Sequence, residues 1–100
     1  MACGMVPVNG TVVEVGPVEL APFDTTYEYV AIRDESDRLR EFKAVRAIPE
    51  VSALVQRDAS GTFLFWDSPH ECRLAFIYRA DGAREVDFEA LHTYFGAAST

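Results

Sequence analysis

The chain has 100 residues, of which 49% are hydrophobic and 25% are charged. This composition is typical of a single globular domain over residues 1–100 and excludes fibrous and disordered classes. Sixteen acidic residues against nine basic ones give a net charge of −7. This charge argues against general nucleic-acid binding, because such domains neutralise phosphates with Lys and Arg. No apolar run approaches the roughly 20 residues that a membrane-spanning helix needs, so we expect no membrane span.

The sequence predicts neither a leader peptide at the N-terminus nor a disulfide between its two cysteines. Residues 1–10 have no basic segment followed by a long apolar one, so they do not resemble a secretory signal peptide. Residues 1–8 are predicted to form a loose lead-in. Cys3 and Cys72 are too few and too far apart to form a disulfide framework. We therefore expect two free thiols and a cytoplasmic location.

The first half of the chain predicts a series of short strands. Residues 12–15 are β-branched and follow an Asn-Gly pair, which indicates a strand. Gly16 and Pro17 bend this strand before it continues over residues 18–20. Residues 25–33 form the next predicted strand. Strict alternation places Tyr27, Tyr29 and Ala31 on one face of it and Glu28, Val30 and Ile32 on the other.

Residues 38–47 fit two different structures. Leu39, Phe42 and Val45 have the three-residue spacing of a helix face. Arg40, Phe42 and Ala44 alternate as they would in a strand that pairs with residues 25–33. We favour the hairpin, because the polar segment 34–37 is typical of a turn between two strands.

The second half predicts further strands after a helical turn. Pro49 fits the first position of that turn, and residues 51–56 fit either a short helix or a short strand. Strands are predicted over residues 62–66 and 72–79. Asp81 and Gly82 then form a typical hairpin turn, which leads to a return strand over residues 84–86.

A short helix is predicted to follow the last strand. Asp87 is typical of an N-cap, and Gly96 is typical of the residue that ends a helix. The apolar side of this helix is predicted to consist of Phe88, Leu91, Tyr94 and Phe95. Residues 97–100 are expected to form a frayed tail.

Five to seven short strands with frequent turns predict a mainly β fold with a short C-terminal helix. Residues 9–16, with the sequence Asn-Gly-Thr-Val-Val-Glu-Val-Gly, resemble the first, curved strand of OB-fold domains. The order that follows is also similar to that fold: strands to residue 47, a helical segment, and strands at 62–66 and 72–79. The resemblance implies a small five- to six-stranded OB-like barrel that binds ligands on the face of its second and third strands. The chain departs from the family in its short helical link and in the return strand and helix after the fifth strand.

Basic residues concentrate between residues 33 and 46, among interleaved acidic ones. A stripe of cations on one strand could bind phosphate or an acidic partner. The alternative is a solvated edge strand, whose charges prevent pairing with other sheets. The candidate binding residues are Arg38, Arg40, Lys43 and Arg46.

Two further groups of residues could in principle form a metal site, a nucleophile pair or a base-stacking platform, but we expect none of these. His70, Glu71 and Cys72 are adjacent, but a zinc site needs about four ligands in tetrahedral geometry. A Cys72–His70 nucleophile pair has no residue nearby that would orient the imidazole. The aromatic residues fit either a base-stacking platform or, as we expect, mainly the hydrophobic core. They are Tyr27, Tyr29, Phe63, Phe65, Trp66, Phe76 and Tyr78.

These observations predict a non-enzymatic small β-barrel module that contacts another protein, either a second copy of itself or a different chain. The alternatives are an OB-like domain that binds single-stranded nucleic acid through residues 38–46, and a small-ligand-binding domain or enzyme. We expect no cofactor and no metal.

Overall fold

The computed structural model describes residues 4–92, which form mainly β-strands. Its elements in chain order are β1 (Gly4–Val15), β2 (Val18–Leu20), β3 (Thr25–Asp34), β4 (Leu39–Ala47), α1 (Pro49–Ser52), β5 (Ser60–Asp67), β6 (Cys72–Arg79) and β7 (Arg84–Val86). A further helix begins at residue 88 and is described to residue 92. The predicted mainly β fold with a short C-terminal helix is therefore confirmed.

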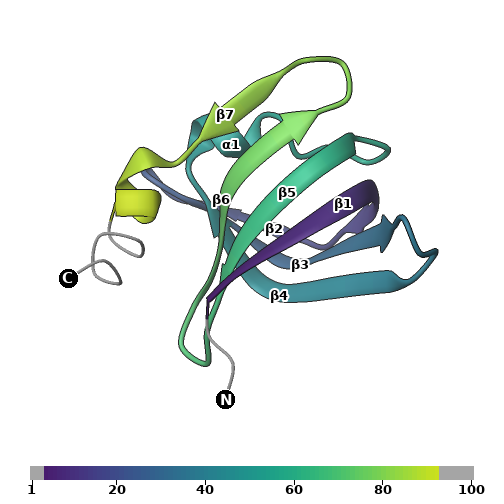
Figure 1. The fold of residues 1–100 in the computed structure, drawn as a ribbon. Helices are drawn as coiled ribbons and strands as arrows, with labels where there is room; N and C mark the ends of the chain where they lie inside the picture. The colour runs from purple at the N-terminus through teal and green to yellow at the C-terminus, as the bar shows by residue number, and fades with distance from the viewer. Residues whose placement is uncertain (1–3, 93–100) are drawn as a thin grey trace.

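The seven strands belong to one sheet, and five of them close into a ring. β1 pairs antiparallel with both β3 and β5, β3 pairs with β4, and β5 pairs with β6. A short parallel pairing of Val45 and Arg46 in β4 with Cys72 and Arg73 in β6 completes the ring of strands. β2 and β7 extend the sheet from β3 and β6 (Figure 1).

β1 closes the ring because it is long enough to pair on both of its sides. Residues 4–11 pair with β5 and residues 10–15 pair with β3, so the two pairings overlap at Gly10 and Thr11, and Gly10 lies opposite Gly61. A Cβ atom at Gly10 would collide with the carbonyl oxygen of Arg33. One at Gly61 would collide with the carbonyl oxygen of Tyr78. Glycine at both positions therefore lets neighbouring backbones approach closely.

Side chains from every strand of the ring fill its interior. Phe42 of β4 and Phe65 of β5 stack with centroids 3.9 Å apart and planes 9° from parallel, which joins two strands that are not neighbours. α1 is a single turn, and a hydrogen bond of 2.6 Å between the hydroxyls of Tyr27 and Ser52 ties it to β3. The largest fully buried side chains are Phe63, Phe65, Ile32, Leu74, Ile77, Val8, Val12, Val30, Val45 and Val51.

β3 and β4 form the predicted hairpin, but their inner faces change halfway along. Tyr27 is buried in the first half of β3, whereas Val30 and Ile32 are buried in the second half, together with the small Ala31 between them. The strict alternation predicted for residues 25–33 is therefore wrong. The change occurs where β3 leaves β2 and begins to pair with β1. Ala44 in β4 adopts a left-handed φ of 52° at the same level, so both strands coil there.

The loose lead-in predicted over residues 1–8 is wrong for the residues that the structure describes. Residues 4–8 belong to β1 and pair with β5. Val8 is 2% exposed in the core, and Val6 packs against the same core. The segment looks irregular in the sequence because Met5 and Pro7, on its other side, are apolar too, which hides the alternation.

The C-terminal helix begins as predicted after Asp87, but it buries a different side chain. The backbone N–H of Ala90 donates to Oδ1 of Asp87 at 2.9 Å, which confirms Asp87 as the N-cap. Ala90 is 7% exposed and Phe88 is 76% exposed, so the predicted apolar side is wrong at Phe88. Two residues correspond to about 200° around a helix, so a helix that buries Ala90 turns Phe88 away. Outside the described residues lie Tyr94, Phe95, Gly96 and the tail 97–100.

Replacing Gly10 with alanine should lower the free energy of unfolding by about 3 kcal/mol, because the new Cβ would collide with the backbone of β3. Gly4→Ala is the matched control in the same strand, since a Cβ at Gly4 meets no atom within 4 Å. This control should change the stability by less than about 0.5 kcal/mol. Urea unfolding followed by circular dichroism measures both variants. An equal change in the free energy of unfolding in both variants would contradict the close approach at Gly10.

Candidate functional site

The four candidate basic residues do not form one continuous positive stripe. Arg38 lies in the turn between β3 and β4, where its backbone N–H donates to Oδ1 of Asp34 at 3.0 Å. Arg40 lies on β4 with its guanidinium 3.8 Å from Asp34 and 5.9 Å from the centre of the Phe42 ring. Only Lys43 and Arg46, further along β4, contribute to one common surface.

Carboxylates neutralise much of the positive charge on β4. Nζ of Lys43 is 3.9 Å from Glu41, and the guanidinium of Arg46 is 3.3 Å from Asp24. Pairs this exposed contribute little to stability, but they reduce the local positive field. β4 also pairs with β6 at Val45 and Arg46, so the alternative prediction of an edge strand is wrong at that end, whereas residues 39–44 pair with β3 alone.

Lys43 and Arg46 line a cleft between β4 and the loop from β5 to β6. The cleft has a volume of about 460 Å³, and the loop contributes His70 together with Asp67 and Glu71. Cations and carboxylates therefore occur together on its walls. This mixture suits a polar segment with charges of both signs better than a strongly anionic ligand.

Cys72 lines the same cleft but is not a reactive thiol. It is 7% exposed. Burial, followed by the negative charges of Asp67 and Glu71, raises the pKa of the thiol to about 12. Because the thiolate is the nucleophile, Cys72 is held in its unreactive form near neutral pH. Within residues 4–92, no group of three or more His, Cys, Asp or Glu side chains is placed to hold a metal ion.

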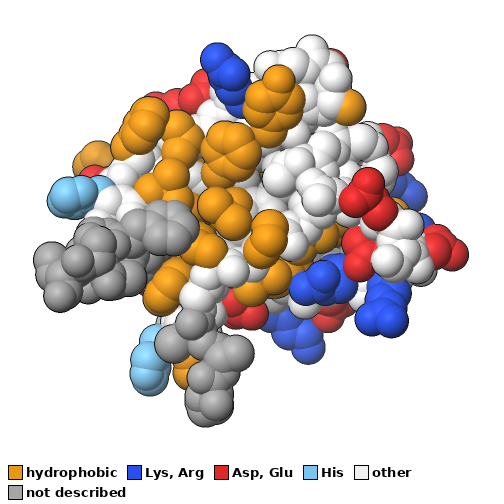
Figure 2. Space-filling view, viewed as in Figure 1, with side chains coloured by type: hydrophobic (Ala, Val, Ile, Leu, Met, Phe, Trp, Pro, Cys, Tyr) orange, Lys and Arg blue, Asp and Glu red, His pale blue; other side chains and the backbone are white. Residues whose placement is uncertain are grey.

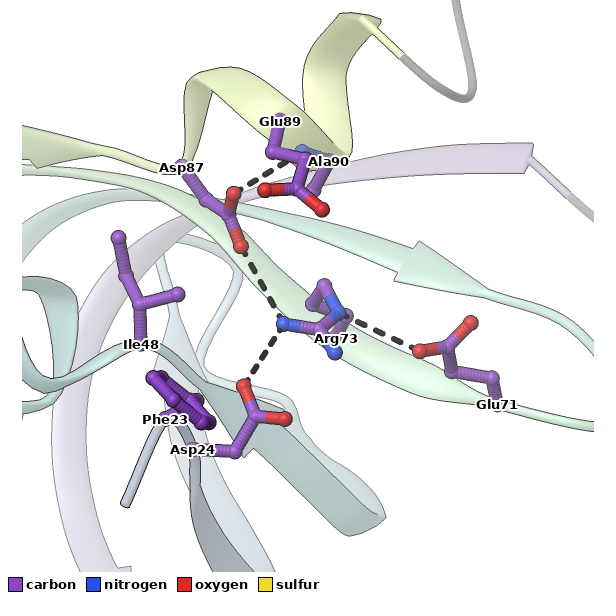
Figure 3. Close-up of a pocket in the computed structure, with 8 residues that line it drawn as sticks. All are labelled: Phe23, Asp24, Ile48, Glu71, Arg73, Asp87, Glu89 and Ala90. Carbon is purple, nitrogen blue, oxygen red and sulfur yellow. Dashed lines mark hydrogen bonds and ion pairs between the residues drawn. The ribbon is translucent and has the colours of Figure 1, made fainter.

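Arg73 of β6 joins three carboxylates from separate parts of the chain (Figure 3). Its Nη1 lies 3.1 Å from Asp24, before β3, and 3.3 Å from Asp87 at the helix N-cap. Its Nε lies 3.3 Å from Glu71. Asp87 binds Arg73 with one carboxylate oxygen and caps the helix with the other. We call these four residues the Arg73 centre, and it docks the C-terminal helix on the sheet.

The carboxylates of the Arg73 centre stabilise the charged form of its guanidinium. Burial alone would lower the pKa of the Arg73 guanidinium, but the hydrogen bonds and charges of Asp24 and Glu71 outweigh burial and raise it. A cavity of about 240 Å³ beside the guanidinium is also lined by Phe23, Ile48, Glu89 and Ala90. Since three ion pairs already engage Arg73, the centre holds elements together rather than offering a free cation to a ligand.

An apolar surface covers the outside of β1, β5, β6 and β7. Phe63 and Phe65 are fully buried, so alternation turns Leu64 and Trp66 outward. The strand register places four apolar side chains side by side in what we call the central row: Pro7, Leu64, Phe76 and Val86. Met5 and Trp66 lie opposite each other in the adjacent row. We call these six residues the outer face.

The outer face is broad, and its six residues carry no charge. Pro7 is exposed and the other five side chains are half-buried. Figure 2 shows hydrophobic side chains gathered over β1, β5 and β6, with charged side chains mostly toward the margins. A polar row borders one side, where the Thr62 hydroxyl donates to Oδ1 of Asn9 at 2.6 Å. The Arg73 centre borders the other side, because Arg73 pairs with Trp66 in register.

The sequence contains a signal for the outer face but none for the Arg73 centre. Residues 63–66, Phe-Leu-Phe-Trp, are apolar at both alternating positions. A strand of this kind has two apolar faces, and both of them are normally covered. The members of the Arg73 centre are spread from residue 24 to residue 87, so no local pattern connects them.

Comparisons with known proteins give no match: neither a family model, nor a curated protein, nor a solved structure corresponds to this chain. None of the helices in the described part of the chain is both long and apolar enough to cross a membrane.

Replacing Arg73 with methionine should lower the free energy of unfolding by about 2–3 kcal/mol, because three carboxylates lose their shared cation. Arg46→Met is the matched control, since Arg46 also pairs with Asp24 but is 48% exposed. It should cost less than about 1 kcal/mol. Thermal unfolding at pH 7 compares the two variants. Similar small losses in both would contradict the docking role of Arg73.

Proposed function

We propose that this chain is a non-enzymatic protein-interaction module that contacts another protein chain through the outer face. The observation that carries this proposal is the central row, in which four apolar side chains lie adjacent on the outside of the sheet. Most apolar side chains on the surface of a monomer are scattered. A contiguous exposed apolar patch with a polar border is typical of a surface that binds a protein.

We further propose that the ring of strands is an OB-like barrel. β1 and β2 both pair antiparallel with β3, so they count as one interrupted strand. The ring then contains five strands, and the fifth pairs between the third and the fourth. α1 lies between the third and fourth of these strands in the chain. This order supports a five-stranded Greek-key barrel of the OB type. The fold does not by itself select a ligand, so the surface has to carry the functional argument.

The buried thiol supports both the non-enzymatic role and a cytoplasmic location. Cys72 lines the largest of the described clefts, yet its high pKa makes it a poor nucleophile. It is also a free cysteine. Small secreted domains more commonly use their cysteines in disulfides.

Changing Leu64 and Phe76 to serine together should abolish most binding of the dye bis-ANS, which fluoresces on exposed apolar surface. The measurement uses submicromolar protein, so that the chains are dilute. Both side chains are half-buried, so we expect each change to cost about 1 kcal/mol of stability and to leave the domain folded. Leu39→Ser is the control, because Leu39 is 54% exposed on β4, away from the outer face. Absence of dye binding by the unmodified chain would contradict the proposal.

The cleft beside β4 favours a second candidate function, the binding of single-stranded nucleic acid. An OB-like domain would use the face of its second and third strands, where Lys43 and Arg46 lie with His70 nearby. The carboxylates of Glu41 and Asp24 and the net charge of −7 oppose this function. We therefore rank it below protein binding.

Titration of a fluorescent single-stranded oligonucleotide tests the second candidate. We expect no saturable binding at physiological salt, because the cations of the cleft are already paired with carboxylates. The double variant Lys43→Glu with Arg46→Glu is the matched comparison. Saturable binding that weakens with added salt and is lost in this variant would establish the second candidate instead.

A further inference from the structure

We infer that the partner on the outer face is a second copy of this chain, packed face to face about a two-fold axis. This inference rests on the proposed function, because it names the occupant of the same surface. It draws on the size of the face, the absence of charge at its centre, and the opposite charges of its two borders.

The outer face can form the apolar centre of a dimer interface. Its central row crosses four strands at a spacing of about 4.8 Å, and Met5 and Trp66 add a second row over two strands, which comes to roughly 200 Å². A standard interface buries about 800 Å² on each partner, with an apolar centre and a polar rim. The molecule measures 37 × 32 × 27 Å. Its broad side is therefore large enough to add the remaining rim around the apolar centre.

The centre of the outer face is compatible with its own copy. In an isologous contact, the same residues meet from both chains, so a charge on the axis would meet a like charge. The central row contains no charged residue, and Leu64 and Phe76 occupy its middle. Two copies stacked on this row therefore bury apolar side chains against each other without burying a charge.

The two borders of the outer face carry opposite charges. Arg84 lies on one border, exposed and opposite Tyr78 in register. The Arg73 centre lies on the other border. Arg73 and Arg46 there face the three carboxylates of the centre, and the exposed Glu89 shares its cavity, so this border keeps a net negative charge. A two-fold axis along the central row brings Arg84 of each copy toward the acidic border of the other. Each border of one copy then faces the oppositely charged border of the other copy.

The test is sedimentation equilibrium of the full chain from micromolar to millimolar concentration, together with the emission of Trp66. Trp66 is the single tryptophan of the chain and belongs to the outer face, so its emission should shift to the red as a dimer dissociates. We expect reversible dimerisation. Leu64→Ser with Phe76→Ser should weaken it by at least about tenfold, whereas Leu39→Ser should leave it unchanged within about twofold.

Charge-reversal variants test the arrangement without touching the apolar residues. Arg84→Glu and Arg38→Glu lower the net charge equally, and both residues are exposed, so both variants should fold. Arg84→Glu should weaken dimerisation several-fold more than Arg38→Glu, because only Arg84 faces the acidic border of the partner. Equal effects of the two reversals would overturn the proposed arrangement.

The outcomes separate this inference from the proposed function. A chain that stays monomeric at millimolar concentration, or a dimer that the Leu64 and Phe76 changes do not weaken, overturns the inference. If such a monomer still binds bis-ANS through the outer face, the proposed function stands and the partner is a different protein. If the monomer binds no dye, both the dimer inference and the proposed function fail. If Tyr94→Ser with Phe95→Ser then restores dye binding, the chain's own C-terminal segment is the occupant.

Discussion

The close approach of backbones at Gly10 and Gly61 is the constraint on which the ring of strands depends. β1 pairs with β3 and β5 at once at Gly10 and Thr11, and at Gly10 the backbone of β3 comes so close that a Cβ atom would collide with it. Without this overlap, the β3–β4 and β5–β6 hairpins would be joined only by the two-residue parallel pairing of β4 with β6. The stacked rings of Phe42 and Phe65 connect these hairpins across the interior, and their burial requires the ring to be closed.

Local features of the fold could be predicted from the sequence, whereas the contacts between distant segments could not. The hairpin at residues 34–37 and the N-cap at Asp87 depend on neighbouring residues, and both were predictable for that reason. The change of face in β3 depends on its having one partner at residues 25–27 and another at residues 30–34. The pairing of residues 4–8 likewise depends on β5, more than fifty positions away. Alternation within a single segment contains no information about such partners.

The candidate site shows the same division between local and distant information. The sequence identified the cations of β4 but not their neutralisation, since Asp24 reaches Arg46 from the loop before β3. The aromatic residues of the apolar run at 63–66 were expected mainly in the core, because such a run fits a buried strand as well as a strand with one face available to a partner. Only the strand register distinguishes these, because it shows that Leu64 lies between Pro7 and Phe76 on the outside.

β5 is therefore the element that connects the fold to the proposed function. Its inward side chains, Phe63 and Phe65, are fully buried in the core, and its outward side chains, Leu64 and Trp66, lie at the centre of the outer face. A partner on the outer face would bury both sides of this strand, as in sheets that are covered on both faces. Because such a partner binds only the folded ring, its binding energy would add to the stability of the fold. A domain of this size has a small core, so a covered outer face would stabilise it in proportion to the apolar area that the contact removes from water.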